Sequence, residues 1–73
     1  MGTVTIVNNT SAKILVRVTG DNESNGSALF TDIEPGKSEG FSRSYEQVAF
    51  AWREDTGATD VFMVVPDNHY TVG

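Results

Sequence analysis

The sequence predicts an all-β fold, a small antiparallel β-sandwich or barrel-like domain of about seven short strands. Turn residues separate short β-like runs along the 73-residue chain, at the roughly 8–12-residue spacing typical of such folds. Several runs alternate apolar and polar residues, as strands with one buried face do. Helical periodicity does not extend over the roughly 10–12 residues that a helix needs. We therefore expect a single domain over residues 1–73.

The expected strands begin and end at turn residues and follow one another without a linker. In chain order they cover residues 3–7, 13–19, 28–33, 39–44, 48–54, 59–65 and 69–72. The second run alternates most regularly, with Ile14, Val16 and Val18 on one face. We expect the first two runs to pair as a hairpin.

The later runs carry more specific turn and core signals. The polar residues 20–27 form a loop, and residues 34–37 place Pro then Gly at the two central positions that favour a type II turn. Phe41 is the expected core residue of the fourth strand. In the fifth strand, alternate large side chains share one face, and Trp52 among them is more naturally assigned to the core than to a ligand site.

The fifth and sixth runs are unusual because they are apolar on both faces. A small sandwich has one interior, so a second apolar face needs a cover. Either a loop covers it, or it is a subunit interface. A small chain without disulfides favours association. We expect a homo-oligomer that buries Phe62 and Val64, or Ala49 and Ala51.

The composition excludes several kinds of site. Without cysteine the chain has neither disulfides nor thiolate metal ligands, and one histidine cannot build a histidine cluster. Five basic and ten acidic residues give a net charge of −5, and the basic residues are scattered. Nucleic acid and anionic lipid both require clustered positive charge, so neither is an expected partner.

Signals for targeting and for membrane insertion are both weak. The longest apolar run, Val61 to Val65, is far too short to span a bilayer. The first residues carry neither the basic segment nor the apolar core of a secretory signal. The sequence as given therefore predicts a cytoplasmic protein without membrane insertion, with secretion by another route left open.

Catalytic chemistry has little support in the sequence. A nucleophile needs a positioned base, and His69 is the only imidazole. Its place at the start of the last strand is more typical of a surface or packing residue. A sandwich of this size leaves little room for a deep cleft between paired carboxylates, and no glycine-rich phosphate loop is present. We expect a non-enzymatic protein without catalytic residues or a required cofactor.

One loop approaches the pattern of an EF-hand calcium site. Oxygen ligands recur at alternate positions of that pattern, with glycine at its sixth position. Here Asp21, Glu23, Asn25 and Asp32 are the candidate ligands. Glu23 is longer than the usual Asp or Asn, Asp32 is shorter than the usual Glu, and strands flank the loop instead of helices. A solvated hairpin loop explains these residues equally well.

A second candidate site joins an exposed aromatic ring to polar groups, the combination that fits a sugar ring and its hydroxyls. The residues proposed to bind such a ligand are Tyr45, Arg43, Glu46, Arg53 and Asp55. Tyr45 lies in a turn and is the aromatic residue expected to be exposed. The turns before and after the fifth strand are about 20 Å apart at some 3.3 Å per residue. One small ligand therefore contacts Tyr45 with Arg43 and Glu46, and Asp55 joins only across a subunit contact.

Part of the chain resembles thaumatin-like proteins. Residues 5–10 (TIVNNT) look like their first strand, and Pro35-Gly36 followed by Phe41-Ser42-Arg43 is similar to a later turn and aromatic-x-Arg pattern. Those proteins are much longer and rich in cysteine, which this chain lacks entirely. In kind, a small acidic cysteine-free β chain is also similar to cytoplasmic fruit-body lectins and defence proteins of fungi.

These observations predict a binding protein that acts as a homo-oligomer. A lectin-like or defence role, with carbohydrate or glycoprotein as partner, is the first hypothesis. The alternative is a structural or protein-interaction β-sandwich without a small-molecule ligand. Binding to a glycan array would separate the two.

Overall fold

The computed structural model describes residues 2–20 and 29–73, and the described part contains strands and turns without helices. The strands are β1 (Gly2–Asn8), β2 (Ile14–Val18), β3 (Thr31–Ile33), β4 (Ser38–Arg43), β5 (Gln47–Arg53), β6 (Thr59–Val64) and β7 (His69–Val72). Each overlaps one of the seven expected runs, although β3 is half as long as the run expected there, and the all-β prediction is confirmed. No helix in these residues offers a long apolar span for crossing a membrane.

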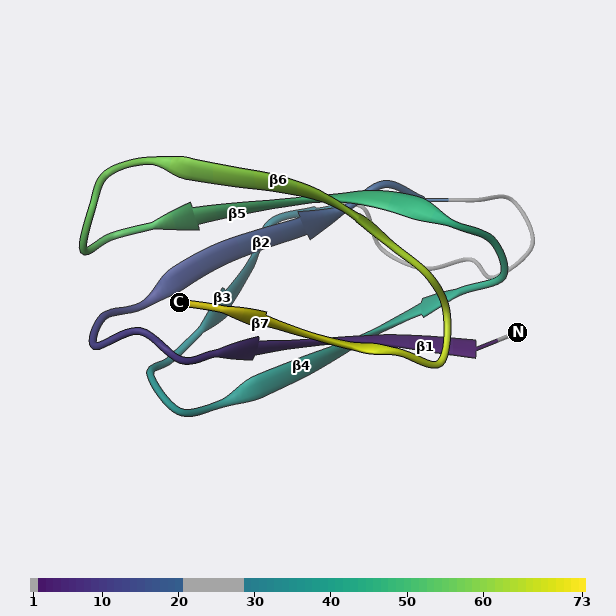
Figure 1. Cartoon of the computed structure of the whole chain (residues 1–73), viewed down its shortest axis with the longest axis horizontal. Coiled ribbons are helices and arrows are strands. Elements are labelled where there is room, and N and C mark those ends of the chain that lie inside the picture. The colour runs from purple at the N-terminus through teal and green to yellow at the C-terminus, as the bar shows by residue number, and fades with distance from the viewer. Residues whose placement is uncertain (1, 21–28) are drawn as a thin grey trace.

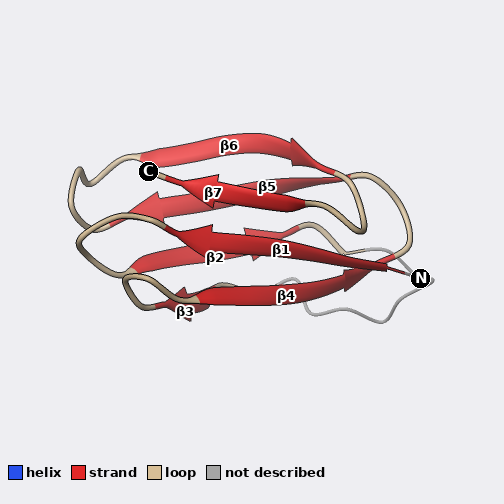
Figure 2. Ribbon diagram, turned by 60° about the horizontal axis from the view of Figure 1, so that its bottom comes forward, coloured by secondary structure: helices blue, strands red, loops and turns tan. Residues whose placement is uncertain are grey.

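Two sheets pack face to face as a small β-sandwich (Figures 1 and 2). One has three strands in the order β4-β1-β7, and the other has four in the order β3-β2-β5-β6. Every pairing is antiparallel except that of β1 with β7, which is parallel. The last strand of the chain therefore returns to lie beside the first.

The expected hairpin of the first two strands is wrong, because β1 and β2 lie in different sheets. The buried Asn8 side chain fixes the crossing between them. Its Nδ2 donates to the carbonyl oxygens of Ala12 at 2.8 Å and Ile33 at 2.9 Å, and its Oδ1 accepts from the Thr10 backbone N–H at 2.8 Å. These bonds hold the turn that takes the chain from one sheet to the other, while β4 and β7 occupy both edges of β1.

The turn between β3 and β4 forms as its sequence predicts. Gly36 has φ of 76°, a left-handed conformation that glycine adopts without strain. The Lys37 N–H donates to the Glu34 carbonyl at 3.0 Å, which closes a type II turn. The Gly36 N–H also donates to the Asn8 carbonyl at 2.9 Å, so this turn lies against the end of β1.

The core lies between the sheets and is almost entirely aliphatic. Its buried apolar residues are Val4, Ile6, Ile14, Val16, Val18, Ile33, Phe41, Ala49, Ala51, Val64 and Val72. Phe41 is a core residue, as predicted. Phe62 and Tyr70 pack against the edge of this cluster, with ring centroids 6.0 Å apart.

The interface residues expected from the sequence belong instead to the inner face of the four-stranded sheet. Ala49, Ala51 and Val64 are completely buried within the chain, and Phe62 is half-buried beside them. The reason is the alternation of side chains along β5. Its small alanines face the opposite sheet, and its large side chains face outward. Trp52 is accordingly half-buried on the outer face, which corrects its assignment to the core.

Candidate functional site

The residues proposed to bind a ligand fall into three different environments. Tyr45 and Glu46 lie in the turn before β5, where Tyr45 is 56% exposed as expected. Arg53 ends β5, and Asp55 follows it in the next turn. The two groups are at opposite ends of the strand, as its length predicts, so they do not form one site.

Arg43, the third member of the Tyr45 group, points into the molecule and is fully buried. Its Nε donates to the Thr19 carbonyl at 2.7 Å, and one Nη donates to the Val18 carbonyl at 2.8 Å. The other Nη donates to the Ser42 carbonyl at 2.6 Å. Because these bonds join β4 of one sheet to the end of β2 in the other, we assign Arg43 to holding the sheets together and leave it out of any ligand surface.

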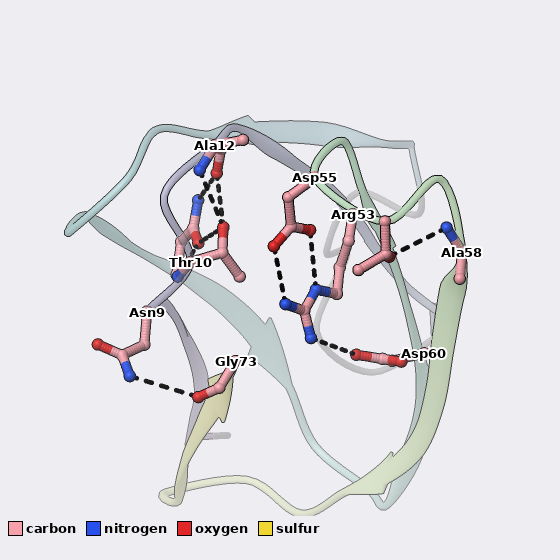
Figure 3. Close-up of polar contacts among 10 residues, drawn as sticks. Asn9, Thr10, Ala12, Arg53, Asp55, Ala58, Asp60 and Gly73 are labelled. Carbon is pink, nitrogen blue, oxygen red and sulfur yellow. Dashed lines mark hydrogen bonds and ion pairs between the residues drawn. The ribbon is translucent and has the colours of Figure 1, made fainter.

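Arg53 instead belongs to a cluster of charges at the β5–β6 turn (Figure 3). Its guanidinium donates to the two carboxylate oxygens of Asp55 at 3.1 and 2.9 Å, and Asp60 lies 3.9 Å away. Hydrogen bonding to Arg53 lowers the pKa of Asp55 below its ordinary value, and the same bond raises the pKa of Arg53. The bidentate bond between Arg53 and Asp55 holds the turn, and Asp60 adds a second, more distant carboxylate.

Most of the calcium candidates, Asp21, Glu23 and Asn25, lie outside the described residues. Asp32 is in β3, where its carboxylate is 3.6 Å from the Lys13 ammonium group. Among residues 2–20 and 29–73, no three His, Cys, Asp or Glu side chains are grouped so as to hold a metal ion. Calcium binding therefore stays a prediction that gains no geometric support.

The most distinctive surface of the molecule is the outer side of the four-stranded sheet. Strand register places apolar side chains opposite one another across its three long strands: Leu15 beside Trp52, Phe50 beside Val61, and Val48 beside Met63. We call these six residues the outer apolar face. Sequence reasoning identified the doubly apolar runs but assigned the wrong members of each run to the surface.

Exposure is greatest on one side of the outer apolar face. Val61 and Met63 on β6 are 58% and 53% exposed, whereas the four residues on β2 and β5 are half-buried by their neighbours. The Arg17 guanidinium lies 5.5 Å from the centre of the Phe50 ring and covers part of it. Since β6 is the edge strand of its sheet, the most exposed part of the outer apolar face lies at a sheet edge.

Comparison with known proteins adds no family assignment: no family model, curated protein or solved structure matches the chain.

Proposed function

We propose that this chain is a non-enzymatic binding module that works by protein association through the outer apolar face, as a homo-oligomer. The observation that carries the proposal is the row of apolar side chains on β5 and β6, with Val61 and Met63 more than half exposed. Contiguous exposed apolar surface of this kind is typical of interaction sites. The proposal corresponds to the second hypothesis, a protein-interaction β-sandwich.

The free energy of burying apolar side chains favours a partner that covers the outer apolar face. Full burial of a valine or methionine side chain is favourable by about 1.5–3 kcal/mol. Val61 and Met63 are 58% and 53% exposed, so a partner on β6 gains about half of that free energy from each residue. A 73-residue chain without cysteine also has no disulfide to supplement its single core. Association therefore adds binding energy and stability together.

Dilution of an isotope-labelled sample tests the proposal. In proton–nitrogen NMR spectra recorded over a wide concentration range, we expect amide signals of Val61 and Met63 to shift with concentration. Thr5 and Thr71, on the outer side of the other sheet, serve as internal controls whose signals stay constant. Unchanged spectra from a chain that sediments as a monomer would contradict association through this face.

Carbohydrate binding in a lectin-like or defence role is the second candidate, supported by the exposed ring of Tyr45. Arg43 anchors the strand immediately before Tyr45, so the ring extends from a fixed position. Glu46 is exposed beside it and offers a carboxylate to sugar hydroxyls.

A glycan array tests this second candidate. We expect Tyr45→Ala to lose a sugar signal that Tyr45→Phe retains, because the phenylalanine keeps the stacking ring. Arg53 and Asp55 lie at the far end of β5, so Asp55→Ala is a matched control that leaves the signal unchanged. An array without a signal for the unsubstituted chain removes the candidate.

A further inference from the structure

The backbone of β6 has hydrogen-bonding groups that point away from the sheet. The Arg53 N–H donates to the Ala58 carbonyl at 2.9 Å. Along an antiparallel ladder, hydrogen-bonded residue pairs alternate with non-hydrogen-bonded pairs. The backbone groups of Asp60, Phe62 and Val64 therefore bond to β5. The residues between them direct their N–H and C=O groups outward: Thr59, Val61 and Met63. No strand in the described part of the chain pairs with this edge.

The outward-pointing N–H that follows β6 is hydrogen-bonded to a side chain of the same molecule. Val65 is the next residue whose N–H points outward, and that N–H donates to the Tyr70 hydroxyl at 2.7 Å. The molecule thus satisfies the outward donor that follows β6 while Thr59, Val61 and Met63 keep theirs available.

The other three strands at sheet edges, β3, β4 and β7, have features that discourage pairing with another strand. Short strands, charged side chains and nearby proline all protect sheet edges. β3 has three residues and is soon followed by Pro35, and β7 has four residues. β4 carries the exposed Glu39 and a glycine in its centre.

Strand β6 has less of this protection, although Pro66 follows it as closely as Pro35 follows β3. It has six residues without lysine, arginine or proline. Its single charge, on Asp60, is 3.9 Å from the Arg53 guanidinium of the same chain. Among the strands at sheet edges, β6 is thus the one that combines six residues with the exposed apolar side chains of Val61 and Met63.

We propose that β6 pairs antiparallel with β6 of a second copy of this chain, which joins the two four-stranded sheets into one. This inference rests on the proposed function and specifies its geometry. The outward groups lie on Thr59, Val61 and Met63, so hydrogen bonds form only between these residues of the two copies. Because residues opposite one another in an antiparallel pair place their side chains on the same face, the Val61 and Met63 side chains of both copies come together there.

Electrostatics restricts the register of the pair. Like charges directly opposite one another destabilise a strand pair. A twofold axis at Val61 places Asp60 opposite Phe62 of the second copy, and an axis at Phe62 places it opposite Val64. Both registers separate the two Asp60 carboxylates. The edge is therefore complementary to itself, as a twofold interface requires.

Removal of one outward N–H tests the edge pairing directly. A synthetic chain with N-methylated Val61 loses a donor that the fold itself does not use, and it keeps every side chain. We expect the dimer dissociation constant, measured by sedimentation velocity, to rise at least about tenfold, since the twofold axis removes two hydrogen bonds. Circular dichroism of the diluted chain checks that the fold is intact.

N-methylation of Gly40 is the matched control. The bond from the Asn8 N–H to the Lys37 carbonyl, 2.9 Å long, fixes the same alternation in the β1–β4 pair, so the Gly40 N–H points outward from the other sheet. This chain is expected to dimerise like the unmodified one. Equal loss of dimer in both chains would contradict a specific role for β6.

Hydrogen exchange on the unmodified chain gives an independent result if the N-methylated chain does not fold. We expect exchange of the Val61 and Met63 amides to slow as concentration rises. Association without such slowing, or association that survives N-methylation of Val61, contradicts the edge pairing but leaves association through the outer apolar face standing. A chain that is monomeric at every concentration contradicts the proposed function itself.

Discussion

The two sheets of this sandwich differ most on the sides that face away from the core. The three-stranded sheet presents mainly small polar side chains there: Thr3, Thr5, Val7, Ser38, Gly40, Ser42, His69 and Thr71. The four-stranded sheet presents the outer apolar face. Hydroxyl groups are well solvated where they are, whereas apolar side chains gain free energy when they are covered. This difference is the reason why we propose that the four-stranded sheet, and not the three-stranded one, makes the contact.

The inner sides of the two sheets differ in the opposite sense. The three-stranded sheet contributes the two buried polar residues of the described core, Asn8 and Arg43. Both reach backbone carbonyls of the other sheet or of the segments that lead into it. The four-stranded sheet contributes only apolar side chains. Directional hydrogen bonds from the three-stranded sheet thus fix how the two sheets are joined. The four-stranded sheet has further apolar side chains on its outer side.

Replacement of Arg43 by methionine is expected to have the largest effect on this arrangement. It leaves the carbonyl oxygens of Val18, Thr19 and Ser42 without the guanidinium donors, two of them across the sheet boundary. An unsatisfied buried group costs about 1–3 kcal/mol, so we expect a loss of about 3 kcal/mol or complete unfolding in urea denaturation. Arg53→Met is the surface control and is expected to change little. Equal stability of Arg43→Met and the unsubstituted chain would show that this arginine does not join the sheets.

Substitution of Asn8 by alanine is expected to destabilise the fold somewhat less. It removes the side-chain bonds to Ala12, Ile33 and Thr10 that hold the crossing between sheets. We expect a loss of about 2–3 kcal/mol in the free energy of unfolding. Asn9→Ala is the control, because the Asn9 side chain is exposed and bonds only the Gly73 carbonyl at 3.3 Å in the described structure. Similar losses for both variants would remove Asn8 from this role.

Two valines of β6 test which of its residues face the core and which face outward. Val64 is completely buried and Val61 is 58% exposed. Val64→Ala is expected to cost about 2 kcal/mol from lost burial and the cavity left behind, whereas Val61→Ala changes monomer stability by less than about 0.5 kcal/mol. Thermal denaturation of dilute samples measures both. A larger effect at Val61 would mean that the strand faces the other way.

The Arg53–Asp55 pair is expected to give the smallest effect, visible in acid titration. The pKa of Asp55 is lowered in the folded chain, so its stabilising contribution is present above the unfolded pKa. It is lost as the pH falls through the folded pKa, below about pH 4. NMR titration should show Arg53→Met raising the Asp55 pKa toward its ordinary value. An unchanged pKa would contradict the bidentate hydrogen bond.

The sequence predicted the strands and turns well because both depend on local chemistry. Alternation in residues 14–18 and the Pro35-Gly36 pair act through neighbouring residues alone. It misjudged the partners of β1, since the crossing depends on Asn8 reaching Ile33, far along the chain. Local pattern carries no information about such a contact.

The candidate site was harder to predict for the same reason. An arginine beside a turn has the same sequence signature whether it extends to solvent or, like Arg43, bonds the opposite sheet. In β5, which is apolar on both faces, residue size suggested that Trp52 is inside and the alanines outside. The packing of two sheets selected the reverse.

Sedimentation velocity of two lysine variants tests the central contrast between the sheets most directly. Val61→Lys adds a charge to the exposed part of the outer apolar face, and Thr5→Lys adds the same charge to the outer side of the three-stranded sheet. We predict that Val61→Lys is monomeric at concentrations where the unsubstituted chain and Thr5→Lys are both associated. Loss of association in Thr5→Lys with retention in Val61→Lys would contradict the account.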